Sequence, residues 1–326
     1  MMIACTGRFR LSSFFGEEVN VSTCFLFPGQ GAQYPGMGRD FYDTSKAVRE
    51  LFELASDASG IDLRRLLFEG SEDELKQTRN TQVAVALIGA AAALNAREHG
   101  LYAAGAAGFS VGEWPALAEA GVVSSEAMFR LVAERGRLMD EAGNRSGGST
   151  MSAILFLAPA AIEAAIKGAG LSQVWIANYN SPTQSVISGT EKDVAAAEEI
   201  LKAAGAKRVV RLKVSGAFHS PIMAWARDGF AEAVADVEFK DPGMALYSNV
   251  TGKRIGSGAE AKKLAVDQIV SPVRWIDEEA AINAAGYAQL LETGPGNVLA
   301  GLWKSVAGGA PCLPAGTLDQ IAAMSL

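Results

Sequence analysis

Short apolar runs alternate with helix-like segments along most of the chain. Residues 22–27 and 103–108 are suited to buried strands, and a glycine-containing break follows each of them. Residues 45–56, 81–99 and 125–142 have the patterns of helices, with the apolar positions of the last on one side. This alternation predicts an α/β fold whose large domain is built on a parallel sheet.

A change of composition at residues 143–150, toward Gly, Ser and Asn, indicates a domain boundary. The segments after it are predicted as strand, helix, strand, strand, helix and strand, at residues 151–157, 159–167, 174–179, 184–188, 191–204 and 208–214. This β-α-β-β-α-β order is that of ferredoxin-like modules. We therefore expect a small domain at 145–213, inserted in a large catalytic domain formed by 22–144 and 214–326. Residues 1–21 are expected to form a leader that takes no part in the fold.

Composition and charge exclude several classes of protein. The chain of 326 residues can bury a large core, and its apolar fraction of 49% excludes global disorder. A net charge of −7 argues against a general nucleic-acid binder, which needs a basic face. Cys5, Cys24 and Cys312 lie far apart without a Cys/His cluster, so we expect no metal site and a reducing, cytoplasmic location. No apolar stretch is long enough to predict a membrane span or a secretory signal.

The pentapeptide G-F-S-V-G at residues 108–112 follows a predicted strand and opens a predicted helix. In this context the G-x-S-x-G pattern presents a nucleophilic serine on a tight turn. The glycines matter because a Cβ at either position would clash or forbid the backbone angles of the turn. Alone the pattern is weak in a chain with 35 glycines, so Ser110 needs a partner base before it predicts catalysis.

The chain has two histidines, and their surroundings differ. His99 lies in a polar stretch that reads as a helix end, where an imidazole can cap the last carbonyls, so we expect a structural role for it. His219 lies in a break between predicted elements and is the candidate base for Ser110. The alternative for His219 is a partly buried loop histidine.

Seven segments, in order, resemble the malonyl-CoA:acyl-carrier-protein transacylase family. They are F-P-G-Q-G-A-Q at 27–33, G-F-S-V-G-E at 108–113, R-G at 135–136, A-F-H-S-P at 217–221, Y-S-N-V-T-G at 247–252, the segment 268–275 and E-T-G-P-G at 292–296. The resemblance runs from about residue 23 to beyond residue 300. It implies an α/β-hydrolase-like large domain with a ferredoxin-like insertion, where the patterns already predict one.

The resemblance also implies a reaction. In this family a malonyl group passes from CoA to the phosphopantetheine thiol of acyl carrier protein by a ping-pong mechanism. Ser110 would attack the thioester while His219 accepts its proton, and the backbone amides of Gln30 and Val111 would form the oxyanion hole. No cofactor is implied, because the CoA thioester and the phosphopantetheine are substrate groups.

Arg135 and Gln268 take their expected roles from the resemblance alone. Arg135 would bind the free malonyl carboxylate bidentately, whereas composition by itself favours an exposed arginine on a helix that also carries Arg130 and Arg137. The backbone carbonyl of Gln268 would orient His219. Because that atom belongs to the main chain, we expect substitution of Gln268 to leave much of the activity.

Three further residues are expected to line the pocket: Phe109, Phe218 and Asn178. Phe218 resembles the malonyl-selective version of the family, in which bulk at this position leaves little room for an α-methyl group. Phe109 is a departure, because the family usually has a histidine immediately before the serine. A phenylalanine cannot exchange protons, so we expect an altered rate or selectivity and not a lost reaction.

Partners and rival functions complete the expectations. An acidic carrier protein needs a local basic patch, and the candidates are Lys202, Lys207, Arg208, Arg211 and Lys213, or Lys253 with Arg254. The rival functions are a serine thioesterase or acyl hydrolase, and a carrier-protein binding module without catalysis. A transferase of a polyketide or malonate pathway is an alternative to one of fatty-acid synthesis.

Overall fold

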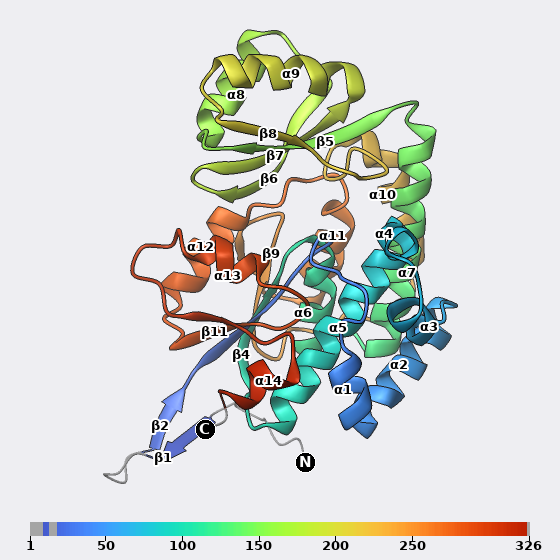
Figure 1. Cartoon of the computed structure of the whole chain (residues 1–326), viewed down its shortest axis with the longest axis vertical. Helices are drawn as coiled ribbons and strands as arrows, with labels where there is room; N and C mark the ends of the chain where they lie inside the picture. The colour runs from blue at the N-terminus through green and yellow to red at the C-terminus, as the bar shows by residue number, and fades with distance from the viewer. Residues whose placement is uncertain (1–8, 13–17, 325–326) are drawn as a thin grey trace.

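The large domain is built on one mostly parallel sheet. The computed structural model describes residues 9–12 and 18–324 (Figure 1). Its six-stranded sheet has the order β10-β9-β4-β3-β11-β12. The parallel strands are β3 (Thr23–Phe27), β4 (Ala103–Gly108), β9 (Ala245–Ser248), β11 (Gln289–Glu292) and β12 (Cys312–Pro314), and β10 (Lys253–Arg254) is antiparallel at one edge. The predicted α/β fold with a parallel core is confirmed.

Helices cover the large sheet, and several begin at a side-chain cap. Ser45, Ser124 and Ser257 each accept a hydrogen bond from the amide three residues further on, which satisfies one of the first free N–H groups of the helix. The helices are α1 (Arg39–Thr44), α2 (Lys46–Ser59), α3 (Leu63–Phe68), α4 (Glu72–Lys76), α5 (Thr78–Glu98), α6 (Glu113–Glu119), α7 (Ser125–Arg145), α10 (Ala224–Val234), α11 (Gly258–Asp267), α12 (Trp275–Ala284), α13 (Val298–Trp303) and α14 (Leu318–Ala322). Among the described helices, none has both the length and the apolar character that a membrane span requires.

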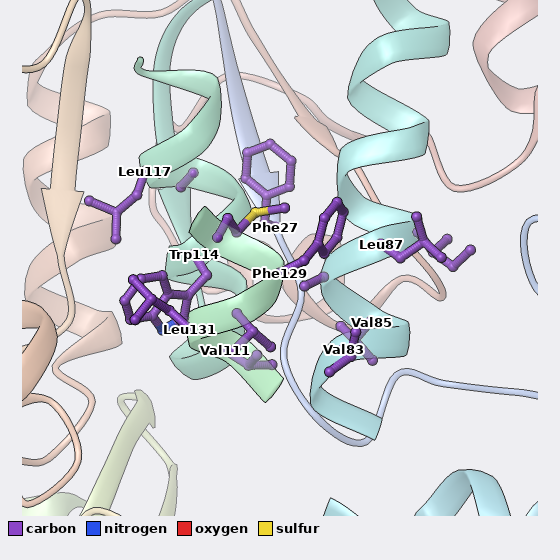
Figure 2. Packing of buried hydrophobic residues seen from close by; sticks show 14 of the residues in the cluster. Phe27, Val83, Val85, Leu87, Val111, Trp114, Leu117, Phe129 and Leu131 are labelled. Carbon is purple, nitrogen blue, oxygen red and sulfur yellow. The ribbon is translucent and has the colours of Figure 1, made fainter. Parts of the chain in front are cut away.

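The main core lies where β3, α5, α6 and α7 meet. Trp114, Phe129 and Leu87 from three of these helices belong to one buried cluster, as does Val111, and Figure 2 labels all four. Trp114 is fully buried and contacts the ring of Phe230 edge-on, at 5.5 Å between ring centroids. Truncation of such a side chain to alanine costs about 3–5 kcal/mol, so this packing holds the start of α6 firmly in place.

A second, antiparallel sheet forms the upper part of the molecule in Figure 1. Its order is β6-β7-β5-β8, and α8 (Pro159–Gly168) and α9 (Glu191–Ala203) cover its outer face. The strands are β5 (Ser149–Leu155), β6 (Val174–Ser181), β7 (Gln184–Thr190) and β8 (Arg208–Arg211). The separate second sheet is confirmed, and its elements follow the predicted β-α-β-β-α-β order inside residues 145–213.

The expected leader falls mostly outside the described residues, because residues 1–8 and 13–17 are not among them. The described parts of it are β1 (Phe9–Ser12) and β2 (Glu18–Val21), which pair in antiparallel register.

Two neighbouring strands bring the predicted motifs to one edge of the large sheet. β3 and β4 pair in parallel, with Phe27 opposite Gly108, so the loops after both strands leave the sheet at the same edge. One loop carries Gln30, and the other is a single 3₁₀ turn, η1 (Ser110–Gly112), followed directly by α6. The small sheet approaches this edge from above, since its edge strand β6 makes two backbone hydrogen bonds with Val273.

Candidate active site

The serine turn is set by close backbone contacts. Ser110 has a left-handed φ of 54°, which a non-glycine residue adopts only under local constraint. A Cβ on Gly108 would lie 2.0 Å from the carbonyl oxygen of Gly112, and a Cβ on Gly112 would lie 2.1 Å from that of Phe27. Only glycine fits at both positions, as the pattern predicted.

The side chain of Asn249, from a distant part of the chain, holds this turn through hydrogen bonds. Its Oδ1 accepts a hydrogen bond from the Ser110 amide at 2.6 Å, and its Nδ2 donates to the Gly108 carbonyl at 2.7 Å. Nδ2 also donates to the buried carboxyl of Glu278 at 2.8 Å, which fixes the orientation of the amide. Burial raises the pKa of Glu278 well above its usual range. One side chain thus holds the end of β4 and the nucleophile in a fixed relation.

His219 lies against Ser110 although the two residues are far apart in the sequence. Its Nε2 is 2.8 Å from Ser110 Oγ, and its Nδ1 is 2.9 Å from the carbonyl oxygen of Gln268 and 3.1 Å from that of Ser271. Since carbonyl oxygens only accept, Nδ1 carries the proton and Nε2 is free to accept one from the serine hydroxyl. This tautomer is the one that a general base requires.

The surroundings of His219 also favour its neutral form. Burial, together with the positive charge of Arg135, lowers the pKa of His219 to about 4. The imidazole is therefore unprotonated at neutral pH and can accept the proton of Ser110. The other histidine caps a helix as expected, because His99 ends α5 and its Nδ1 lies 2.9 Å from the Asn95 carbonyl.

Arg135 is completely buried, so the alternative of an exposed arginine is wrong. Its Nη1 donates to Gln82 Oε1 at 2.5 Å, and its Nη2 donates to Gln268 Oε1 at 2.9 Å and to Ser110 Oγ at 3.3 Å. Its Nε has no hydrogen-bond partner among the described residues. Burial lowers the pKa of Arg135 to about 10, which still leaves a cation at neutral pH. The guanidinium is thus a buried positive charge with a spare donor beside the nucleophile.

A cavity of about 290 Å³ connects these groups and lies between the two sheets. Met151, Ala153 and Val186 of the small sheet line it on one side, and Gly29 and Leu299 of the large domain line it on the other. The predicted site residues on its wall are Gln30, Phe109, Ser110, Val111, Arg135, Asn178, Phe218 and His219. Gln268 lies behind this wall, in contact with Arg135 and His219.

The two expected oxyanion donors flank the nucleophile. Val111 is the second residue of η1, and its buried side chain anchors it in the main core (Figure 2). The first amides of a helical turn have no partner within the turn and are available to a ligand. Gln30 follows β3 in the adjoining loop, where Gly29 packs so closely that a Cβ there would lie 2.6 Å from the Phe109 carbonyl. Their donor roles stay predictions.

Sequence reasoning gave no role to several residues that the structure places here. Glu113 and Asn249 stood inside the quoted motifs without a function, and Gln82 is the last of the five consecutive polar residues at the start of α5, before its long apolar stretch. Its place directly beside that apolar stretch was a weak signal, because a polar side chain on a buried helix needs a buried partner. The contribution of the Ser271 carbonyl had no signal in the sequence, since any residue carries one.

The protein-family model of the acyl transferase domain matches residues 24–316 of this chain. The malonyl CoA-acyl carrier protein transacylase of Bacillus subtilis (strain 168) is 38% identical over 285 residues, which cover 86% of this chain and 89% of that protein. The chain belongs to the malonyl-CoA:acyl-carrier-protein transacylase family. The resemblance of its motifs to that family is therefore confirmed.

Two solved structures of malonyl transacylases show the same architecture. The crystal structure of MCAT from Streptococcus pneumoniae has a TM-score of 0.88 at 38% identity, and the match covers 93% of this chain and 99% of that one. A malonyl-transacylase solved in complex with its type II PKS acyl-carrier protein has a TM-score of 0.87 at 36% identity, and the match covers 92% of this chain and 98% of that one. The likeness thus extends over both the large and the small sheet.

Proposed function

We propose that the protein transfers a malonyl group from CoA to the phosphopantetheine thiol of an acyl carrier protein, through a malonyl-Ser110 intermediate. The observation that carries this proposal is the Ser110 Oγ, which lies 2.8 Å from His219 Nε2 and 3.3 Å from the buried guanidinium of Arg135. A base and a fixed cation at one hydroxyl suit an acyl group that ends in a carboxylate. The names of the relatives support the same substrates.

The first half-reaction acylates the serine. Ser110 Oγ forms a bond to the thioester carbon while its proton moves to His219 Nε2, and the carbonyl electrons move onto oxygen. The backbone amides of Gln30 and Val111 stabilise that oxyanion, and one such donor is worth about 3 kcal/mol. The C–S bond then breaks, and His219 returns the proton to the CoA sulfur.

The second half-reaction runs the same steps in reverse order. The carrier thiol enters the cavity after CoA has left, gives its proton to His219 and attacks the malonyl ester. Collapse of the second oxyanion breaks the bond to Ser110, whose oxygen recovers the proton from the imidazole. Every step uses side chains and backbone amides of this chain, so we propose a reaction that needs no cofactor.

Arg135 selects the acyl group in this proposal. Its unpartnered Nε and its Nη2 are donors to the free carboxylate of a malonyl group, which acetyl-CoA lacks. Phe218 and Asn178, both on the cavity wall, limit the space around the α-carbon. Competition between malonyl-CoA, methylmalonyl-CoA and acetyl-CoA measures this selection and narrows the choice of pathway.

Intact-mass spectrometry after mixing with malonyl-CoA tests the proposal. We expect a mass gain of one malonyl group in the wild type and none in Ser110→Ala. The adduct should persist in water and discharge within seconds of adding a carrier thiol. Rapid loss in water alone would favour the acyl hydrolase, and no adduct at all would favour the non-catalytic binding module.

The basic segment 207–213, which runs toward the cavity wall at Leu212, is the proposed docking surface for the carrier protein. Arg208 lies opposite Leu155 in the antiparallel pair β8–β5, on the same face of the strand as Val210. Leu212, two residues after Val210, lines the cavity. Arg211 and Lys202 already pair with Glu198 and Glu199. Lys207, Arg208 and Lys213 form no ion pair with any described residue, and the Lys207 ammonium lies 5.8 Å from the centroid of the Phe156 ring.

Charge reversal separates this docking surface from the chemistry. Arg208→Glu with Lys213→Glu should slow discharge to an acidic carrier protein about tenfold or more and leave acylation by malonyl-CoA unchanged. The matched control is Lys253→Glu with Arg254→Glu on β10, the other basic pair. Equal loss in both half-reactions would reject the surface.

The proposed domain boundaries and cellular compartment rest on composition and topology. We assign residues 22–144 and 214–326 to a catalytic domain and 145–213 to a ferredoxin-like one. The two described cysteines, Cys24 and Cys312, are free thiols, which is compatible with a reducing cytoplasm as the proposed compartment.

A further inference from the structure

The side chain of Gln268 contacts three groups around the nucleophile: Arg135, Glu113 and the backbone of Ser110. Its Oε1 accepts a hydrogen bond from Arg135 Nη2 at 2.9 Å. Its Nε2 donates to a carboxylate oxygen of Glu113 and, at 3.1 Å, to the backbone carbonyl of Ser110. The orienting role expected for Gln268 concerns its main-chain oxygen alone and does not explain these contacts.

The chemistry of its neighbours fixes the orientation of this amide. A guanidinium only donates, so Oε1 must face Arg135, and Nε2 is then directed at a carboxyl oxygen of Glu113 that accepts its hydrogen bond. A flipped amide would set donor against donor at Arg135 and acceptor against acceptor at Glu113. Gln268 therefore has one favourable arrangement, and Glu113 is the group that enforces it from the side opposite Arg135.

All three side chains are buried, which makes the arrangement energetically important. Arg135, Gln268 and Glu113 are 0%, 1% and 2% exposed, respectively. A buried charge is costly unless it is paired and hydrogen-bonded. In its ionised form Glu113 supplies the opposite charge, and in either form the Gln268 amide links it to Arg135. Burial raises the pKa of Glu113 to about 7, while the hydrogen bond from Gln268 and the charge of Arg135 oppose that rise.

We propose that Glu113 and the Gln268 side chain form a positioning pair that holds the Arg135 guanidinium at Ser110, so that selection of an anionic acyl group depends on Glu113. The inference rests on the proposed malonyl transfer and adds a positioning residue to it. Gln82 holds the other guanidinium nitrogen at 2.5 Å, so loss of the pair loosens Arg135 without freeing it. The orienting carbonyl of Gln268 is retained, so proton transfer to His219 should change less than selection.

Single-turnover acylation with malonyl-CoA and with acetyl-CoA tests the pair. In Glu113→Ala and in Gln268→Ala we expect the malonyl-to-acetyl ratio of kcat/KM to fall about 10- to 100-fold, mostly through a higher KM for malonyl-CoA. Because both residues act through one contact, the double variant should lose no more than the more affected single variant. Glu113→Gln keeps an acceptor oxygen and should recover most of the ratio.

Two controls separate positioning from general damage. Glu279→Ala removes another buried carboxyl, which accepts a hydrogen bond from the Trp275 indole outside this network, and should leave the ratio unchanged. If the alanine variants fail to fold, the exchange Glu113→Gln with Gln268→Glu replaces them, since it swaps donor and acceptor across the contact. Partial recovery of the ratio relative to Gln268→Glu alone supports the pair.

Three results would overturn the positioning pair: additive losses in the double variant, equal losses toward both thioesters, or no recovery in the exchange. Failure of the proposed function itself looks different. In that case the wild type forms no malonyl adduct, and no ratio is measurable for any variant.

Discussion

The nucleophile Ser110 and the base His219 both lie on strained turns, but different contacts hold each of them in place. Ser110 and His219 both have left-handed backbones, with φ of 54° and 57°. The serine turn is fixed by the close approach of backbone carbonyls, those of Gly112 and Phe27, to two glycines that no larger residue can replace. The imidazole of His219 is fixed by the carbonyls of Gln268 and Ser271, about 50 residues further along the chain. The nucleophile is thus placed mainly by steric fit and the base by hydrogen bonds to distant carbonyls.

The largest expected effect comes from disturbing the steric fit of the serine turn. In Gly112→Ala the new Cβ would lie 2.1 Å from the Phe27 carbonyl oxygen, a backbone atom that cannot move aside cheaply. We expect the free energy of unfolding to fall by about 1–3 kcal/mol or more and acylation of Ser110 to be lost. Urea unfolding and the malonyl adduct measure the two effects.

The matched control is Gly301→Ala on the exposed side of α13, where a new Cβ would meet nothing within 4 Å. Alanine there should stabilise the helix by about 0.5–1 kcal/mol and leave acylation intact. Equal behaviour of the two variants would mean that the serine turn is not sterically determined.

The next effect tests a distant side chain that holds the serine turn. Asn249→Ala removes the hydrogen bonds to the Ser110 amide and the Gly108 carbonyl and leaves Glu278 without its donor. A buried polar group left unpaired costs about 1–3 kcal/mol, so we expect destabilisation of that size and acylation slowed about 10- to 100-fold.

Asn95→Ala is the control for Asn249→Ala, because Asn95 is also buried and its side chain, among the described residues, bonds only to Glu98 at the far end of α5. It should leave the rate of acylation unchanged. An unaltered rate in Asn249→Ala would show that the glycines alone hold the nucleophile.

The lowered pKa of His219 predicts how the rate of acylation depends on pH. With the pKa of His219 lowered to about 4, its imidazole stays neutral at pH 5.5, where a free histidine of pKa about 6.5 is roughly nine-tenths protonated. Acylation should therefore stay nearly flat from pH 7 to pH 5 and fall only as the pH drops through about 4. NMR titration of the imidazoles reads this directly, because the chain has two histidines and His219→Ala assigns the signals.

Arg135→Gln sharpens the titration. The positive charge of Arg135 is the second cause of the lowered pKa after burial, so its removal should move the His219 signal to higher pH. A His219 signal that titrates near pH 6.5 in the wild type would contradict the buried, neutral base.

The same contrast explains what the sequence could predict. The strand, the glycines and the turn around Ser110 are close in the sequence, so the hydrophobic pattern and the G-x-S-x-G spacing predicted the serine turn. The approach of Arg135 to Ser110 depends on chain crossings that no local pattern encodes, and it was expected only from the resemblance to a family. His219 was predicted as the base for Ser110 from the residues themselves, because the chain has two histidines and the other one was expected to cap a helix. The contacts of Glu113 and the Gln268 side chain were not predicted, because a buried amide network depends on atomic positions in three separate helical or loop segments.

The smallest expected effect concerns Phe109, where the family usually has a histidine. The Phe109 ring contacts Trp275 at 5.5 Å between centroids and 60° between planes, and it lines the cavity without a polar partner. Phe109→His gives up this aromatic pair, which is worth about 0.5–1.5 kcal/mol beyond its buried area. The backbone of the turn is held by the glycines and by Asn249, so the acylation rate should change less than tenfold. Thermal unfolding and single-turnover acylation check both parts, and a loss of acylation comparable to that of Gly112→Ala would mean that the side chain before the serine, and not the local backbone, positions the nucleophile.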